Sequence, residues 1–264
     1  MDQEAINRAA ELFRDNRLKP IPLAALPDDC RPGSESDAYR IQEALAPLLT
    51  AAGMGPVAGY KIGCTTPVMQ AYLEIDHPCA GHIFGHTVGL GEDSFPHARF
   101  HHVGVECELA VNLVTDLPAA NAPYDRQMVA AAVGGIMAAI EVVDDRYADF
   151  RALDAPSLVA DDFFGAGCVL GSAQPLAGLD PAALEGSMAI NGEVVGTGLG
   201  RDILGHPLEA LVWLANARAE RGRGLRAGDF VLLGSLVETK WVAVGDVVEI
   251  DIQGLGTATA RFPG

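Results

Sequence analysis

The chain has 264 residues, a length that permits one large domain or two small ones. Hydrophobic residues make up 49% of it and charged residues 20%, which is typical of a folded globular protein rather than a disordered one. Acidic residues outnumber basic residues 35 to 18, and the resulting net charge of −17 would repel nucleic acid, so we expect no nucleic-acid partner.

The N-terminal part of the chain has the apolar spacing of helices. Helices are predicted over residues 3–14 and 36–49, with a proline-containing loop over residues 18–33 between them. Ser34 or Ser36 would cap the second helix. We expect this helical part, residues 1–55, to precede a β-rich catalytic domain over residues 56–264.

Beyond Gly53 the sequence changes to short apolar runs separated by glycine and proline, which indicate strands. Strands are predicted at residues 57–63, 81–85, 103–111, 136–143, 188–190, 230–233, 247–252 and 258–262. Helices are predicted at residues 66–73, 125–133 and 207–218. Since strands dominate and do not alternate regularly with helices, we predict an α+β fold with a curved mixed or antiparallel core and peripheral helices.

The cysteines and the N-terminus indicate a cellular location. The five cysteines are widely spaced, form no CxxC pair and are odd in number, which does not suit a disulfide framework. The N-terminus carries charges where a signal peptide would need an apolar stretch, and no run of about 18 apolar residues occurs. We therefore expect a cytoplasmic protein with no membrane partner.

The strongest candidate site lies on the strand predicted over residues 103–111. Its period-two alternation places Glu106 and Glu108 together on one face, opposite an apolar face. Mg²⁺ and Mn²⁺ prefer carboxylate oxygen and keep positions open for substrate. Glu141 is the candidate third ligand, because it lies in an apolar run where an unpaired charge is costly to bury. The alternative is that the first two glutamates form the wet face of a sheet.

Lys61 is the candidate catalytic residue. It is one of three lysines in the chain and lies in the apolar segment VAGYKIGC. A partly buried lysine pairs with an anion or has a lowered pKa, and either state suits it to move a proton or hold a substrate carboxylate. The alternative is a lysine at a strand end whose ammonium reaches water.

Further patterns carry weaker signals. Six of the seven histidines lie between His77 and His102, but no HExxH or paired Cys/His spacing supports a zinc site. The segment GTGLGRDILGHP, residues 196–207, is predicted to be a tight loop whose backbone amides hold an anionic group, with Gly200 as its candidate contact. Ser235 follows a strand without an indicated histidine and acid, so a nucleophilic role is not favoured.

Ordered segments along nearly the whole chain share a family pattern. They are SESDAYRIQEAL, GYKIGCTTPVMQ, DHPCAGHIF, VECELAV, AAIEVVDDR, GTGLGRDILGHPLEALVWLA, GDFVLLGSL and VAVGDVVEIDIQGLGTATARF. Together they resemble the 2-hydroxypentadienoate (2-keto-4-pentenoate) hydratase and 4-oxalocrotonate decarboxylase family of the fumarylacetoacetate hydrolase superfamily. The resemblance implies a mixed β-sandwich roll with an N-terminal helical part, a bound Mg²⁺ or Mn²⁺, and a homo-oligomer.

The resemblance also assigns residues. By motif position, Glu106, Glu108 and Glu141 take the family's three metal-ligand places, and Lys61 takes that of its active-site lysine. The chain departs from the pattern in the implied substrate pocket: Cys79 stands where an aspartate is common, and Asp162 and Phe164 stand where an amide and a hydroxyl are usual. With Gly200 and Ser235, these three are the candidate substrate-binding residues.

The resemblance implies an enzyme that acts on small 2-oxo or 2-hydroxy-dienoate acids from aromatic-ring breakdown. The leading hypothesis is metal-assisted addition of water, with an enolate stabilised by the ion. The rival hypotheses are decarboxylation or carbon–carbon hydrolysis at the same site, and a non-catalytic subunit that binds an active relative. A decarboxylase or aldolase of the same pathway is the expected protein partner.

Overall fold

The structure is a computed structural model that describes residues 1–19 and 21–264. A mixed β-sheet forms its centre. Its twelve strands follow the order β2-β1-β10-β5-β6-β7-β3-β4-β12-β11-β8-β9. Most neighbours are antiparallel, and the pairs β1–β10, β3–β7 and β4–β12 are parallel. The strands are β1 (Val57–Gly63), β2 (Cys79–Phe84), β3 (Val88–Leu90), β4 (Glu92–Ser94), β5 (Val103–Leu113), β6 (Val133–Asp144), β7 (Gly165–Leu170), β8 (Glu185–Ile190), β9 (Glu193–Leu199), β10 (Phe230–Trp241), β11 (Val247–Ile252) and β12 (Gly256–Arg261).

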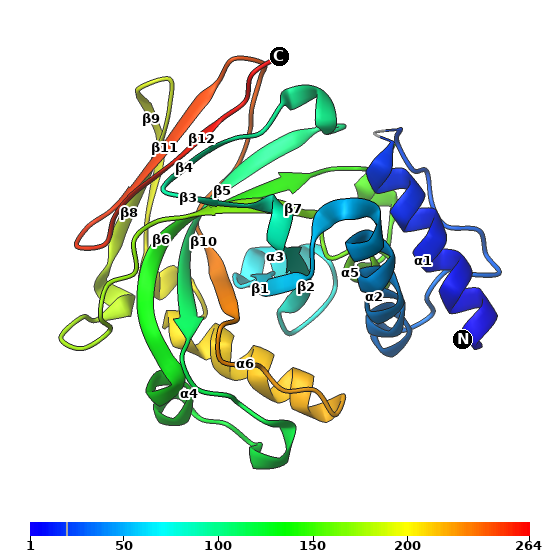
Figure 1. The fold of residues 1–264 in the computed structure, drawn as a ribbon, viewed down its shortest axis with the longest axis horizontal. Helices are drawn as coiled ribbons and strands as arrows, with labels where there is room; N and C mark the ends of the chain where they lie inside the picture. The colour runs from blue at the N-terminus through cyan, green and yellow to red at the C-terminus, as the bar shows by residue number, and fades with distance from the viewer. Residues whose placement is uncertain (20) are drawn as a thin grey trace.

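The sheet folds back on itself, so that β8, β9, β11 and β12 lie over β5, β6 and β10 (Figure 1). The main core fills the space between these layers, where the Cys107 thiol of β5 donates to the Ser187 carbonyl of β8. The opposite face of β5 points toward β1 and β2, where Ala110 packs with Ile83 and Leu232 in a second, smaller cluster. Alternation along β5 therefore divides the sandwich core from the face that carries Glu106 and Glu108.

The helices pack at the periphery (Figure 1). They are α1 (Gln3–Leu18), α2 (Glu35–Leu49), a π-helical turn (Thr50–Met54), α3 (Pro67–Tyr72), α4 (Arg126–Ala132), α5 (Ala155–Ala160) and α6 (Pro207–Glu220). Ser34 caps α2 by accepting a hydrogen bond from the Asp37 amide. Gln42 of α2 donates to the carbonyls of Ala80 in β2, at 2.7 Å, and Val159 in α5. The helical layer is thus bonded directly to the sheet.

The predicted α+β fold class is confirmed, and the differences lie in particular segments. The chain from residue 18 is not all loop, because Leu18 ends α1 and Leu23 forms an isolated bridge with Tyr147. The glycine-rich segment begins within β9 rather than in a loop. Strand β7 was missed because it is nearly buried throughout and so lacks alternation. Nowhere in residues 1–19 and 21–264 is a helix long and apolar enough to cross a membrane.

Candidate metal centre

Three glutamates converge on one face of the central strands. Glu106 of β5 lies directly opposite Glu141 of β6 in the antiparallel register, and Glu108 lies two residues further along β5. One carboxylate oxygen from each residue lies within 4.8 Å of the others. Glu108 is 0% exposed and Glu141 1%, while Glu106 is half-buried. The alternative that these glutamates form a solvated face is therefore wrong for Glu108, while Glu106 lies at the partly exposed side of the cluster.

The hydrogen bonds of these carboxylates leave oxygens free to bind an ion. Oε2 of Glu108 accepts a 2.6 Å hydrogen bond from the Gly234 amide, and Oε1 of Glu106 accepts one from the Thr239 hydroxyl. Oε1 of Glu108 and Oε2 of Glu141 are buried without a hydrogen-bond donor among the described residues, and Oε1 of Glu141 faces only the Lys61 ammonium. Because buried polar atoms are normally paired, this all-oxygen set fits a hard divalent cation.

Lys61 of β1 points at the same cluster. Its Nζ lies 3.1 Å from Oε1 of Glu141, in an ion pair, and donates a 3.1 Å hydrogen bond to the Phe163 carbonyl. The Phe163 ring lies beside it, with its centroid 5.0 Å from Nζ. Burial works against the charged lysine, but the carboxylates of Glu141 and Glu106 outweigh it and raise the pKa of Lys61. At 2% exposure, this ammonium does not reach water.

The carboxylates are electrostatically unfavourable to one another. Burial, with the neighbouring carboxylates of Glu141 and Glu106, raises the pKa of Glu108 well above its usual range. Burial also raises the pKa of Glu141 to about 8, against the opposing effect of Lys61. A bound cation would remove this penalty by favouring the ionised forms.

An unusual turn places the Phe163 carbonyl against Lys61. Asp162, Phe163 and Phe164 have φ values of 51°, 46° and 65°, three consecutive residues in the left-handed region that non-glycine residues rarely adopt. Such strain persists only where surrounding contacts fix it. The turn connects α5 to β7, and its carbonyl at Phe163 is the acceptor for the Lys61 ammonium.

Charged groups hold this turn from both sides. Asp162 accepts hydrogen bonds from Arg17 of α1 at 2.9 Å, from the His82 amide at 2.9 Å and from the His82 ring at 3.0 Å. Burial raises the pKa of Asp162, but Arg17 and His82 outweigh it and lower the value to about 2. Asp161 binds Nε of Arg17 at 2.7 Å and Nε of Arg146 at 2.8 Å.

Sequence reasoning named Asp162 as a substrate contact and missed the other residues that support the turn. The available signal is the adjacent pair Asp161 and Asp162 in the apolar segment VADDFF, since buried carboxylates need cationic partners. The partners themselves, Arg17 and Arg146, are 144 and 15 residues from Asp161 along the chain. No local pattern connects them.

Two of the candidate substrate-binding residues lie beside the cluster. The Cys79 thiol is buried and lies 3.7 Å from Sγ of Cys64, and a Cβ at neighbouring Gly63 would touch both Sγ of Cys79 and the Phe163 ring. Ser235 lies opposite Glu108 in the register of β10 and β5, and its hydroxyl donates to the Val237 carbonyl at 2.6 Å.

The remaining candidates make contacts elsewhere. The Phe164 ring packs against Tyr147 and Phe150, so the ring beside Lys61 is that of Phe163. The Gly200 amide donates to the Leu184 carbonyl at 2.8 Å. Further amides of the glycine-rich segment are engaged as well, including Leu199 N with the Asp202 carboxylate and Leu204 N with the Thr65 carbonyl. Asp162 acts on the cluster through the turn described above.

Comparison with known proteins gives extensive matches. Residues 85–262 match the family model "Fumarylacetoacetate (FAA) hydrolase C-terminal". The chain is 35% identical over 264 residues to a 2-keto-4-pentenoate hydratase of Burkholderia vietnamiensis, covering 99% of this chain and 98% of that protein. It is 30% identical over 263 residues to a 4-oxalocrotonate decarboxylase of Pseudomonas putida, with 99% and 98% coverage. The solved structure of 4-oxalocrotonate decarboxylase from Pseudomonas putida G7, complexed with magnesium and adipate, superimposes with a TM-score of 0.93 at 29% identity, covering 99% of this chain and 98% of that one.

Proposed function

Because the chain belongs to the fumarylacetoacetate hydrolase family, we propose that its three buried glutamates and Lys61 form the active site of a divalent-metal-dependent hydratase. The enzyme adds water to a small 2-hydroxy-dienoate or 2-oxo-enoate acid from the breakdown of aromatic compounds. The full-length similarity to a 2-keto-4-pentenoate hydratase supports this reaction. The observation that carries the proposal is the convergence of three carboxylates, with buried oxygens of Glu108 and Glu141 that lack a donor, beside a buried ammonium.

Glu106, Glu108 and Glu141 would hold Mg²⁺ or Mn²⁺ through the oxygens that their hydrogen bonds leave free. When bound, such an ion supplies Lewis acidity toward the oxygens of a chelating 2-oxo acid. Lys61, which lies 3.1 Å from Glu141, is placed to hold the substrate carboxylate or to deliver a proton from Nζ. The Phe163 ring beside Nζ excludes water from one side of the ammonium.

Cys79 stands where an aspartate is common in the family, and this difference limits which group can transfer a proton. Burial, with the hydrogen bond to Cys64, raises the pKa of the Cys79 thiol well above its ordinary value. A neutral thiol cannot replace a carboxylate as a base. We therefore assign proton transfer to Lys61, with the neutral Cys79 thiol as an apolar group beside it. Ser235 stays a proposed substrate contact, while the contacts of Phe164, Asp162 and Gly200 favour structural roles.

Decarboxylation is the second candidate reaction. The TM-score of 0.93 and the 30% identity to 4-oxalocrotonate decarboxylases favour it over carbon–carbon hydrolysis. Hydration and decarboxylation need the same stabilised enolate, so the products distinguish them: hydration adds the mass of water without a fragment, and decarboxylation releases CO₂.

The test combines turnover and metal binding. Purified enzyme loaded with Mg²⁺ or Mn²⁺ is incubated with a panel of 2-hydroxydienoates while ultraviolet absorbance and product masses are followed. Glu106→Gln should lose metal affinity and turnover together, and Glu238→Gln, whose side chain on β10 is 88% exposed, serves as the matched control. Unchanged turnover in chelator-treated protein would remove the proposal, and metal binding without turnover would favour the non-catalytic subunit.

The cellular location and the assembly of the enzyme are further parts of the proposal. We place it in the cytoplasm, as five free, buried thiols support. We also propose a homo-oligomer, with a decarboxylase or aldolase of the same pathway as its partner. Light scattering of the pure protein, alone and mixed with such an enzyme, tests both assignments.

A further inference from the structure

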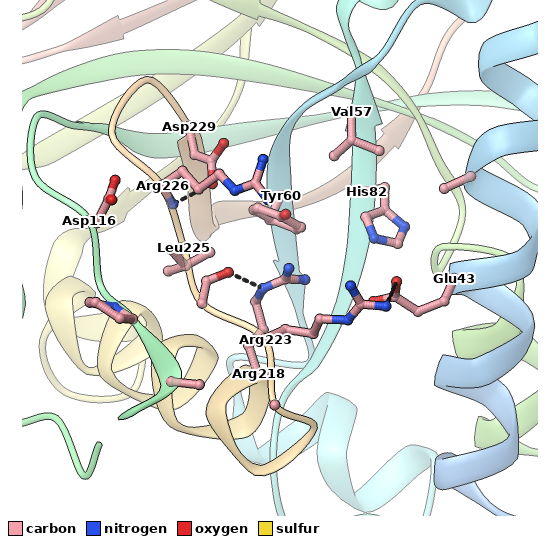
Figure 2. A pocket seen from close by; sticks show the side chains of 15 residues that line it. Glu43, Val57, Tyr60, His82, Asp116, Arg218, Arg223, Leu225, Arg226 and Asp229 are labelled. Carbon is pink, nitrogen blue, oxygen red and sulfur yellow. Dashed lines mark hydrogen bonds and ion pairs between the residues drawn. The ribbon is translucent and has the colours of Figure 1, made fainter. Parts of the chain in front are cut away.

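A polar cavity lies between the segment that follows α6 and the strands β1 and β2, and none of the three metal-cluster glutamates lines it (Figure 2). Its volume is about 540 Å³, which is large enough for a small metabolite. We propose that this cavity binds a small organic carboxylate, at a site separate from the metal centre. The proposal goes beyond the hydratase activity and does not depend on it.

Arg218 is the principal anion-binding group. Its side chain is nine-tenths buried, its Nε donates to the Gly224 carbonyl at 3.2 Å, and its guanidinium lies 4.1 Å from the centre of the Tyr60 ring. No partner for its two terminal nitrogens is found in the part of the chain that the structure describes, and Figure 2 shows them directed into the cavity. A guanidinium fixed in this way presents two parallel donors to a carboxylate.

Two more buried polar groups face the same space. Tyr60 is 8% exposed and His82 7%, and both line the cavity. The Tyr60 hydroxyl has no hydrogen-bond partner within the described residues. The His82 ring is held through its Nδ1 by the Asp162 carboxylate at 3.0 Å, which directs its remaining edge to the cavity (Figure 2). Their polar atoms open onto the cavity, where a ligand can bond to them.

The acidic residues of the lining already have partners. Glu43 forms a 3.2 Å ion pair with Arg223, and the carboxylates of Asp116 and Asp229 each accept a backbone amide at 2.8 Å. For the side chain of Arg226, by contrast, no ion pair is found among the described residues. Asp116 and Asp229 keep their negative charges, so we expect the anion at Arg218, whose terminal nitrogens have no carboxylate partner among the described residues, with Arg226 lining the same cavity.

This cavity and the metal centre are different places. Tyr60 and Lys61 are successive residues of β1 and so project from opposite faces. Asp116 follows the C-terminal end of β5, whereas Glu108 lies near its middle, and the stretch from Glu108 to Leu113 alone spans about 17 Å. No glutamate of the metal cluster lines the cavity.

The test is calorimetric titration of the chelator-treated full chain with succinate, pyruvate and inorganic phosphate. We expect succinate or pyruvate to bind with one site per chain. Arg218→Gln should weaken that binding at least tenfold, as loss of a charged hydrogen-bonding partner does. Tyr60→Phe and Arg226→Ala should weaken it less, and Glu106→Gln should leave it unchanged. Arg226 is exposed, so its variant tests the site even where Arg218→Gln misfolds.

Four results would overturn the proposal. Absence of carboxylate binding to the wild type refutes it directly, as does equal affinity in wild type, Arg218→Gln and Arg226→Ala. Binding of phosphate alone refutes the carboxylate class. Binding lost in Glu106→Gln but kept in Arg218→Gln would assign the anion to the metal centre. Since no turnover is measured, failure here leaves the hydratase proposal untouched.

Discussion

Glu106 and Glu141 face each other across β5 and β6, an arrangement that like charges disfavour in a sheet. The alternation of β5 predicted the shared face of Glu106 and Glu108 from sequence. The approach of Glu141 was predicted only from its apolar flanks, because the pairing of β5 with β6 is set by the whole sheet. The contact of Lys61 on β1 with Glu141 on β6 depends on the fold of the whole sheet, since β10 and β5 lie between these two strands.

The pH dependence of metal stabilisation follows from these carboxylates. Burial raises the pKa of Glu141 to about 8, so in the metal-free protein this group stabilises the fold below about pH 4 and loses that contribution as the pH rises through 8. Mg²⁺ binds the ionised form. We expect Mg²⁺ to raise the Tm more at pH 8 than at pH 6 in thermal unfolding, and Glu141→Gln to abolish the difference. An equal or larger shift at pH 6 would contradict this account.

Lys61→Met tests the ammonium at nearly constant volume. We expect kcat to fall about 100-fold or more, the usual range for a proton-transfer group, while Mn²⁺ binding measured by calorimetry is retained. Lys240→Met, on β10, is the matched control and should keep normal turnover. Activity of Lys61→Met within about threefold of the wild type would show that Lys61 is not the catalytic group.

At the scale of elements, the left-handed turn after α5 illustrates what sequence cannot predict. Local propensity opposes three consecutive non-glycine residues with positive φ, and the turn exists because Arg17 and Arg146 bind its preceding carboxylates from distant segments. A helix was predicted over residues 3–14, but α1 continues to Leu18, so Arg17 and its role in holding the turn lay outside the predicted range. Tertiary ion pairs of this kind leave no periodic signal.

Arg17→Gln tests this support. Asp162 has a folded-state pKa of about 2, so it contributes about 2 kcal/mol at neutral pH, and this is lost as the pH falls from about 5 toward 2. Removing Arg17 leaves two buried carboxylates poorly compensated, and urea unfolding at pH 7 should show a loss of about 3 kcal/mol. The difference from wild type should shrink at pH 3. Arg14→Gln, on the same helix, should have little effect, and a pH-independent difference would refute the assignment.

Substitution of Gly200 tests whether this residue is needed for backbone packing or for contact with the substrate. A Cβ at this position would lie 1.8 Å from the Pro181 carbonyl oxygen, so Gly200→Ala must displace the backbone. We expect the free energy of unfolding to fall by about 2 to 4 kcal/mol in denaturant titration. Gly33→Ala, which meets nothing within 4 Å, is the control. Unchanged stability with a raised KM would instead favour direct contact with substrate.

At the scale of the whole molecule, the predicted boundary near residue 55 lies where the helices end and the sheet begins. Hydrogen bonds and ion pairs nevertheless cross this boundary. Gln42 and Arg17 bind groups beyond it. We expect residues 1–55 and 56–264 to unfold together, with superimposable denaturant curves from far-ultraviolet circular dichroism and from fluorescence of Trp213 and Trp241. An earlier transition in circular dichroism alone would show a separable helical unit.

The buried oxygens of Glu108 and Glu141 tie ion binding to the stability of the folded protein. At a free ion concentration about 100 times Kd, binding adds about 2.7 kcal/mol to the folded state. That is a large share of the roughly 5 to 15 kcal/mol that commonly separates native from unfolded chains. The cellular concentration of the ion would then control the resistance of the protein to proteolysis as well as its catalytic rate.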